Sequence, residues 1–122
     1  MSESLRRSRE ELAAAELLAR EGFTAQAVSR AYYAAFYAAE SALAALSETR
    51  SKHAGVVAAF GQLVIKEHGL DPSAGRALHA LFEMRLDADY EQEPVPEEEA
   101  TAAIDAAKQC VDAVAAWLTS RA

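Results

Sequence analysis

The most constraining feature of this 122-residue sequence is an alanine-rich segment, residues 30–40, that carries four aromatic side chains in two pairs. Tyr32 and Tyr33 are followed four residues later by Phe36 and Tyr37, so all four lie on one stripe of a helix with about 3.6 residues per turn. A tyrosine ring favours burial, but its hydroxyl needs a hydrogen-bond partner. The segment therefore predicts a central helix. Two arrangements are open for the tyrosine hydroxyls of this helix. They form a polar network inside a packed interface, or they lie at the rim of an amphipathic core helix.

The composition predicts an all-helical fold, because apolar residues make up 52% of the chain and only five glycines and three prolines interrupt them. The formal charge of −7 argues against general electrostatic binding of nucleic acid, which depends on many lysines and arginines, but it allows a small local basic pocket. Cys110 is the single cysteine and excludes an internal disulfide. With a charged amino terminus and no apolar stretch of membrane-spanning length, we expect a cytoplasmic protein without a membrane contact.

Glycines, prolines and capping residues divide the sequence into five expected helices. Two loops, 47–50 and 91–96, are too polar or too rich in proline to be helical. Thr24 and Ser51 are expected as N-caps of the second and third helices. The expected helices run from Ser2 or Ser4 to Gly22, from Thr24 to about Leu46, from Ser51 to Gly69, from Asp71-Pro72 to about Tyr90, and onward from Glu97. Short loops join them, so we expect one domain, residues 1–122, folded as an up-and-down antiparallel bundle of four to five helices.

A second motif, residues 84–90, holds side chains suited to ligand binding. Arg85 and Asp89 lie one turn apart, and the planar guanidinium of an arginine matches a phosphate or a carboxylate. Asp89 would orient the arginine, and Tyr90 would donate a hydrogen bond. The alternative is a simple ion pair four residues apart with a tyrosine at the helix end.

His53 follows Lys52 near an expected helix start, where the positive end of the helix dipole disfavours the imidazolium form. A neutral imidazole there would serve as an acceptor or a base, and the alternative is an exposed or capping histidine. The sequence has no histidine pair at metal-ligand spacing and no glycine-rich phosphate loop. We therefore expect neither a metal nor a cofactor.

These motifs together resemble the HEPN domain family (higher eukaryotes and prokaryotes nucleotide-binding), in particular its small stand-alone prokaryotic members. The matching segments are RAYYAAFYAAESAL at 30–43, KHAGVVAAFGQLVIK at 52–66 and RLDADY at 85–90, and the resemblance runs from about residue 8 to residue 118. It implies a helical bundle that forms a two-fold homodimer with a functional cleft between the copies. Many such relatives are metal-independent ribonucleases of toxin-antitoxin systems, often partnered with a minimal nucleotidyltransferase.

The sequence departs from the ribonuclease members of that family at one point. Those members carry an arginine followed, after four to six residues, by a histidine. The arginine carries over to Arg85, but the residues at those offsets are Tyr90, Glu91 and Gln92. Tyr90 resembles in position the tyrosine-bearing end of the motif, which in some relatives is modified with AMP by the partner transferase. The resemblance thus implies nucleotide or RNA binding, while the missing histidine puts RNA cleavage in question.

These observations lead to one hypothesis and two alternatives. The hypothesis is a dimeric HEPN-type protein that works with a nucleotidyltransferase or another toxin-antitoxin component and binds a nucleotide or RNA phosphate at the dimer cleft. One alternative is a divergent ribonuclease that uses His53 or a tyrosine in place of the missing histidine, and the other is a non-catalytic assembly module. The expected ligand-binding residues are Arg85, Asp89, Tyr90, Tyr32, Tyr33 and Arg30, and the catalytic candidates are Arg85, His53 and Tyr90.

Overall fold

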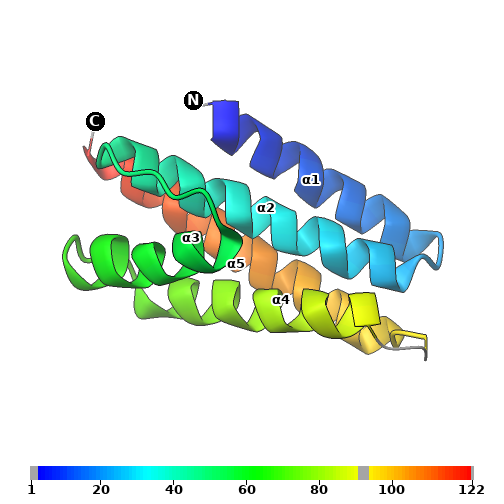
Figure 1. The fold of residues 1–122 in the computed structure, drawn as a ribbon. Coiled ribbons are helices and arrows are strands. Elements are labelled where there is room, and N and C mark those ends of the chain that lie inside the picture. The colour runs from blue at the N-terminus through cyan, green and yellow to red at the C-terminus, as the bar shows by residue number, and fades with distance from the viewer. Residues whose placement is uncertain (1–2, 91–93, 122) are drawn as a thin grey trace.

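The computed structural model describes residues 3–90 and 94–121, and within these ranges the chain forms a bundle of helices without a strand (Figure 1). The all-helical class and the five expected helical regions are confirmed. None of the described helices combines the length and the hydropathy needed to span a membrane. The elements are α1 (Glu3–Arg20), α2 (Thr24–Ala45), α3 (His53–Ala59), the π-helical segment η1 (Phe60–Lys66), α4 (Pro72–Tyr90) and α5 (Glu97–Arg121).

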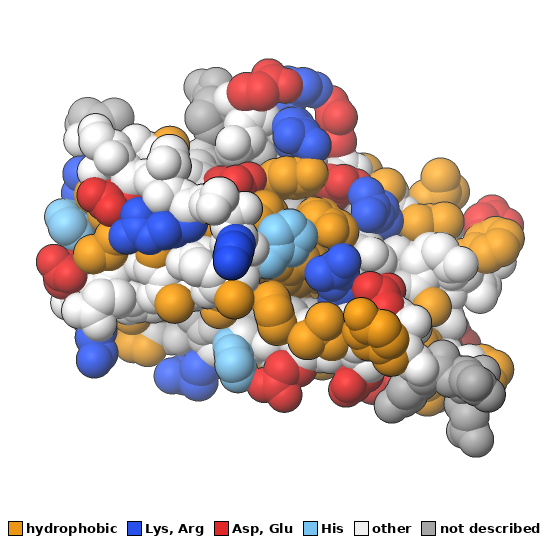
Figure 2. Space-filling model, in the orientation of Figure 1, with side chains coloured by type: hydrophobic (Ala, Val, Ile, Leu, Met, Phe, Trp, Pro, Cys, Tyr) orange, Lys and Arg blue, Asp and Glu red, His pale blue; other side chains and the backbone are white. Residues whose placement is uncertain are grey.

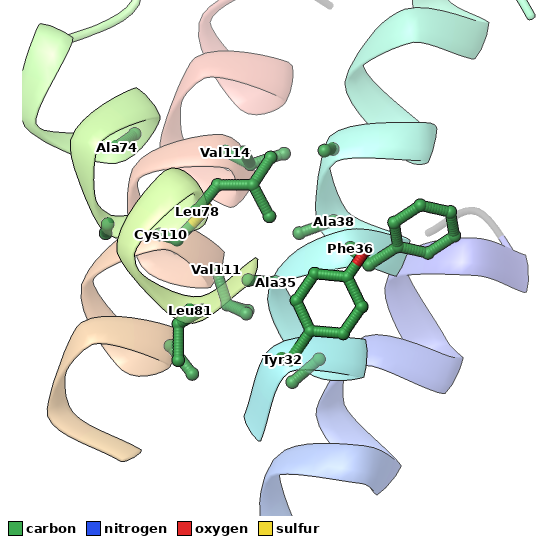
Figure 3. Close-up of a cluster of buried hydrophobic side chains, with 14 of the residues drawn as sticks. Tyr32, Ala35, Phe36, Ala38, Ala74, Leu78, Leu81, Cys110, Val111 and Val114 are labelled. Carbon is green, nitrogen blue, oxygen red and sulfur yellow. The ribbon is translucent and has the colours of Figure 1, made fainter. Parts of the chain in front are cut away.

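Helix α2 is the centre of the bundle and contacts every other helix. Its inner faces are built largely from alanines, which let neighbouring helices approach its backbone closely. Leu78 and Leu81 of α4 and Val111 and Val114 of α5 fill the space beside them (Figure 3). The fully buried alanines of α2 are Ala27, Ala31, Ala34, Ala35, Ala38, Ala39 and Ala42.

The predicted helix ends at glycine are confirmed. Gly22 follows α1 with a φ of 87°, and Gly69 follows η1 with a φ of 75°, a conformation that residues with a Cβ rarely adopt. The predicted start of α4 is confirmed as well, since Asp71 Oδ1 accepts a hydrogen bond from the Ser73 N–H at 2.9 Å. Pro72 occupies the first helical position.

The predicted N-caps Thr24 and Ser51 are wrong. The N-cap of α2 is Phe23 and that of α3 is Lys52, and neither makes a side-chain capping bond. The Thr24 hydroxyl donates instead to the Val95 carbonyl oxygen at 2.7 Å. It thereby joins the start of α2 to the segment that precedes α5. A contact across 71 residues cannot be read from local sequence.

The connection between α2 and α3 departs from the predicted up-and-down order. Residues 46–52 run back along the bundle, so that α3 begins beside the middle of α2 instead of at its end (Figure 1). His53, the first residue of α3, hydrogen-bonds Tyr32, and Val56 shares a small cavity with Leu43 further along α2. Helices α2 and α3 therefore run in roughly the same direction, whereas α1 is antiparallel to α2 and α4 to α5. This return places His53 beside the aromatic stripe.

The third helical region changes geometry at Phe60, where α3 passes into the π-helical turns of η1. The indole N–H of Trp117 on α5 donates to the His68 carbonyl oxygen at 3.0 Å, just after η1. A Cβ at Gly75 of α4 would collide with the end of the Ile65 side chain, so glycine allows α4 to pass close to η1. The sequence pattern predicted a helix here but not this change of winding.

Close approach to the alanines of α2 predicts that enlarging one of them destabilises the bundle. Ala35→Leu places a larger side chain at a fully buried position and should lower the free energy of unfolding by roughly 1–3 kcal/mol. Ala44→Leu makes the same change at an exposed position of the same helix and should leave stability within about 0.5 kcal/mol. Urea unfolding of both variants measures the difference. Equal effects would contradict the packing described here.

Candidate functional site

Three helices bring together the side chains of Tyr32, Tyr33, His53 and Arg85, here called the Arg85 cluster. Helix α2 contributes the tyrosines from its middle, α3 contributes His53 as its first residue, and α4 contributes Arg85 from its last two turns. The His53 ring centroid lies 5.8 Å from that of Tyr32 and 5.7 Å from that of Tyr33. In Figure 2, histidine and basic side chains lie among apolar ones on the face that these helices form.

Arg85 lies over the two tyrosine rings, with its Cζ 5.5 Å from the Tyr32 centroid and 5.4 Å from the Tyr33 centroid. Such a position attracts the cation to the negative ring faces. Asp89 Oδ2 lies 3.4 Å from Arg85 Nε, which makes an ion pair without the alignment of a hydrogen bond. Within the described residues, this buried Nε has no hydrogen-bond partner. An N–H that is buried without a hydrogen bond is unfavourable, so Nε–H is suited to a better acceptor than the misaligned Asp89 carboxylate, and the Arg85 side chain as a whole is still 25% exposed.

His53 is half-buried against the aromatic stripe. Its ring centroid is 4.3 Å from that of Phe36, and its Nδ1 is 3.2 Å from the Tyr32 hydroxyl. Burial, followed by the positive charge of Arg85, lowers the pKa of His53 below its ordinary value of 6.5. The imidazole is therefore neutral at physiological pH. The sequence favours a neutral histidine through the helix dipole, and in the structure burial and the Arg85 charge favour the same form.

Tyr32 is completely buried, and its surroundings hold it in the phenol form. Burial raises the pKa of Tyr32 well above its ordinary value of 10, and the nearby Arg85 cation offsets only part of that rise. The Tyr32 hydroxyl is thus a neutral hydrogen-bonding group. It is not a source of negative charge in the site.

The predicted residue Arg30 lies at the border of the cluster. Its Cζ is 4.9 Å from the Tyr33 ring centroid, so the Tyr33 ring contacts both Arg30 and Arg85. The Arg30 guanidinium is already engaged by Glu11 of α1, with Nη1 at 2.9 and 3.1 Å from the two carboxylate oxygens. Arg30 therefore supports the position of Tyr33, and of these two arginines it is Arg85 that has a buried donor without a hydrogen bond among the described residues.

Asp89 and Tyr90 lie further out along α4. The Asp89 side chain is 44% exposed, and its carboxylate faces Arg85. Tyr90 is 82% exposed, so its ring does not pack into the cluster as the aromatic residues of α2 do. The predicted ion pair is present, and the roles of these two residues in ligand binding remain predictions.

The sequence reasoning missed an apolar groove beside the cluster. It has a volume of about 290 Å³ and lies between α3 and α4, lined by Ala54, Val57, Ala58, His79 and Phe82. The Phe82 ring also meets the Tyr32 ring edge to face, with centroids 6.0 Å apart, so the groove adjoins the cluster. Two sequence features link the groove to the cluster: Phe82 precedes Arg85 by one helical turn, and Ala54 directly follows His53.

This chain is similar to one family model and to several known proteins. A family model described as the HEPN domain matches residues 1–117. "Putative toxin MJ0605" of Methanocaldococcus jannaschii is 35% identical over 105 residues, which are 86% of this chain and 78% of that protein. A "UPF0332 protein" of Thermotoga maritima is 39% identical over 70% of this chain and 64% of its own length. "UPF0332 protein glr0978" of Gloeobacter violaceus is 36% identical over 69% of this chain and 67% of its own length.

The environment of His53 predicts an acidic titration that depends on Arg85. A histidine pKa below 6.5 in the folded protein means that the unfolded chain binds the proton more readily, so stability should fall as pH drops below about 6.5. Arg85→Gln removes the nearby cation and should raise the pKa of His53. Because burial is the larger cause, the pKa should still stay below 6.5. Titration of the histidine ring protons by NMR measures both values.

The matched control for this titration is Arg76→Gln, which removes an exposed cation from the same helix and should leave the pKa of His53 unchanged. A wild-type pKa of 6.5 or more would contradict the described burial. A pKa that ignores Arg85→Gln would contradict the contact with Arg85.

Proposed function

Because the chain belongs to the HEPN domain family, we propose that it is a toxin-like HEPN protein that binds a phosphate group of RNA or of a nucleotide at the Arg85 cluster. The observation that carries this proposal is the buried Arg85 Nε, which has no hydrogen-bond partner within the described residues. A partly exposed guanidinium beside aromatic rings, whose Nε–H makes no hydrogen bond to the protein, is suited to a phosphate oxygen. The name of the M. jannaschii relative supports the toxin-like class.

The charge distribution supports a local contact with phosphate. The chain has a net charge of −7, so long-range attraction to a polyanion is absent. Recognition then depends on a few donors at one place, and the cluster offers Arg85 and His53 there. Half-buried Tyr33 adds an aromatic ring next to the arginine, a type of surface on which unpaired bases stack. A single-stranded RNA segment or a nucleotide fits these properties better than duplex nucleic acid.

The proposal includes a homodimer whose copies meet beside the Arg85 cluster. The apolar groove between α3 and α4 supports this arrangement, because its half-buried Val57 and Phe82 and its exposed Ala54 and Ala58 adjoin the cluster. A second copy packed over the groove would bring two Arg85 side chains to one cleft. A cleft with two such arginines would contact successive phosphates of one RNA strand.

The proposal also includes a protein partner. The resemblance of residues 85–90 to the family motif implies a minimal nucleotidyltransferase that neutralises the protein. Tyr90 supports this part, since a ring that is 82% exposed at the end of α4 is open to an enzyme that would modify its hydroxyl. A cytoplasmic location accords with such a system.

RNA cleavage is the second candidate function, and one observation favours it. The ribonuclease motif lacks its histidine in the sequence, yet the return of residues 46–52 brings His53 of another helix to the same cluster as Arg85. A neutral imidazole beside a phosphate anchor is the arrangement that a general base requires. Binding and cleavage therefore share this site and differ in what His53 does.

The proposed phosphate anchor predicts a specific loss of binding in Arg85→Ala. A hydrogen bond to a charged group contributes roughly 1.5–3 kcal/mol, so the affinity for a short single-stranded oligouridylate should fall about 10-fold to 100-fold. Arg76→Ala removes an exposed arginine from the same helix and should change the affinity by less than about twofold. Fluorescence anisotropy with labelled RNA measures all three proteins.

Circular dichroism should show the same helical content in the wild type and both variants, so that a loss of affinity reports the site. Equal affinities of Arg85→Ala and the wild type would remove the proposed anchor. Shortening of the RNA during incubation with the wild type, but not with His53→Ala, would favour cleavage over binding alone.

The proposed dimer predicts that a charge in the groove yields single chains. Ala58→Glu puts a carboxylate on an exposed residue of the groove, so it should separate the copies without disturbing the core of each. Ala102→Glu makes the same change at an exposed position of α5 and should leave the dimer intact. Light scattering coupled to size-exclusion chromatography gives the masses. A wild type of monomer mass, or a dimer unaffected by Ala58→Glu, would contradict this interface.

A further inference from the structure

The hydrogen bond between Tyr32 and His53 has a direction that the chemistry of the two groups decides. We propose that Tyr32 is a positioning residue that donates its hydroxyl hydrogen to His53 Nδ1 and so keeps the imidazole proton on Nε2. His53 then offers Nε2–H as a donor to a phosphate oxygen held by Arg85. This inference rests on the proposed phosphate binding and assigns the part that His53 plays in it.

The Tyr32 hydroxyl lies in the core, where it needs a hydrogen-bond acceptor. The residue is 0% exposed, and His53 Nδ1, at 3.2 Å, is the one hydrogen-bond partner of this hydroxyl within the described part of the chain. A phenol has one hydrogen to donate, and a neutral imidazole has one nitrogen with a free lone pair. If Nδ1 carried the ring proton instead, the buried hydroxyl hydrogen would have no acceptor. Only the tautomer with an unprotonated Nδ1 satisfies both groups.

The charge state of the His53 ring depends on the groups around it. The titratable groups around His53 are Tyr32 and Tyr33 from α2 and Arg85 from α4. None of these groups is a carboxylate that would stabilise an imidazolium, and the Arg85 cation disfavours that form. The imidazole is therefore neutral near pH 7, and the choice of tautomer decides which of its nitrogens donates.

With Nδ1 occupied by Tyr32, Nε2 is the ring nitrogen left for a ligand. A protonated Nε2 can donate to a phosphate oxygen but cannot accept a proton from a ribose hydroxyl. The cluster then holds two donors, Arg85 Nε–H and His53 Nε2–H, and both suit an anion. The inference thus favours binding over base-catalysed cleavage at this site.

Long-range proton-nitrogen NMR spectra of ¹⁵N-labelled protein at about pH 8 test the tautomer, because protonated and unprotonated ring nitrogens have well-separated shifts. The chain has three histidines, and His53→Gln identifies the signals of His53 by their loss. We expect an unprotonated Nδ1 and a protonated Nε2 in the wild type. In Tyr32→Phe, which keeps the buried ring, both nitrogens should move toward the averaged shifts of a mixed tautomer.

Tyr33→Phe is the matched control, since it removes the hydroxyl of the neighbouring ring, and it should leave the His53 shifts in place. A protonated Nδ1 in the wild type would overturn the inference. Shifts unchanged in Tyr32→Phe would overturn it equally, because the tautomer would then have another cause.

Binding of a short oligouridylate tests the consequence. His53→Gln keeps an N–H donor and should stay within about twofold of the wild-type affinity, whereas His53→Ala should lose about threefold to tenfold. Equal losses in the two variants would contradict the donor role. Arg85→Ala should lower the affinity about 10-fold to 100-fold while leaving the His53 tautomer unchanged. Failure of phosphate binding and failure of the tautomer assignment are therefore seen in separate measurements.

Discussion

The structure depends on the burial of one tyrosine. Tyr32 lies in the alanine-packed centre of the bundle, where its ring is fully buried and its hydroxyl still needs a partner. That partner is His53, and the hydrogen bond between them joins the first residue of α3 to the middle of α2. The same ring lies under the Arg85 guanidinium. One buried side chain thus connects the core to the three helices that form the site, and a polar network inside a packed interface is the arrangement observed around it.

Much of the fold could be predicted because its determinants are local. The helices and most of their ends could be predicted from features that act within a few residues. These are the alanine content, the glycines that end α1 and η1, and the Asp71-Pro72 start of α4. The return of residues 46–52, the π-helical turns of η1 and the Thr24 to Val95 bond could not be predicted, since each depends on contacts between distant segments. The same division applies to the site. Spacing along single helices identified Arg85 and the tyrosines as candidate site residues. Their contact with His53 could not be predicted, because it depends on how three helices pack together.

The chain lacks the histidine of the family's ribonuclease motif, but the fold brings another histidine close to Arg85. This is His53 of α3, which joins the same cluster through the Tyr32 hydroxyl. An imidazole held by a buried phenol at Nδ1 differs from one whose nitrogens both face solvent, because its tautomer is set by the core. Under the proposed tautomer, the chain combines a cationic side chain at Arg85 with a histidine arranged as a donor. That arrangement supports the proposed toxin-like protein that binds RNA without a general base in place.

The most direct test of this account is the NMR signal of the Arg85 side-chain Nε–H during titration with a short single-stranded RNA. Because this N–H has no hydrogen-bond partner within the described residues, its signal should shift when a phosphate oxygen becomes its acceptor. The shift should saturate together with the binding curve. An Arg85 signal that stays in place while RNA binds elsewhere on the protein would contradict the account.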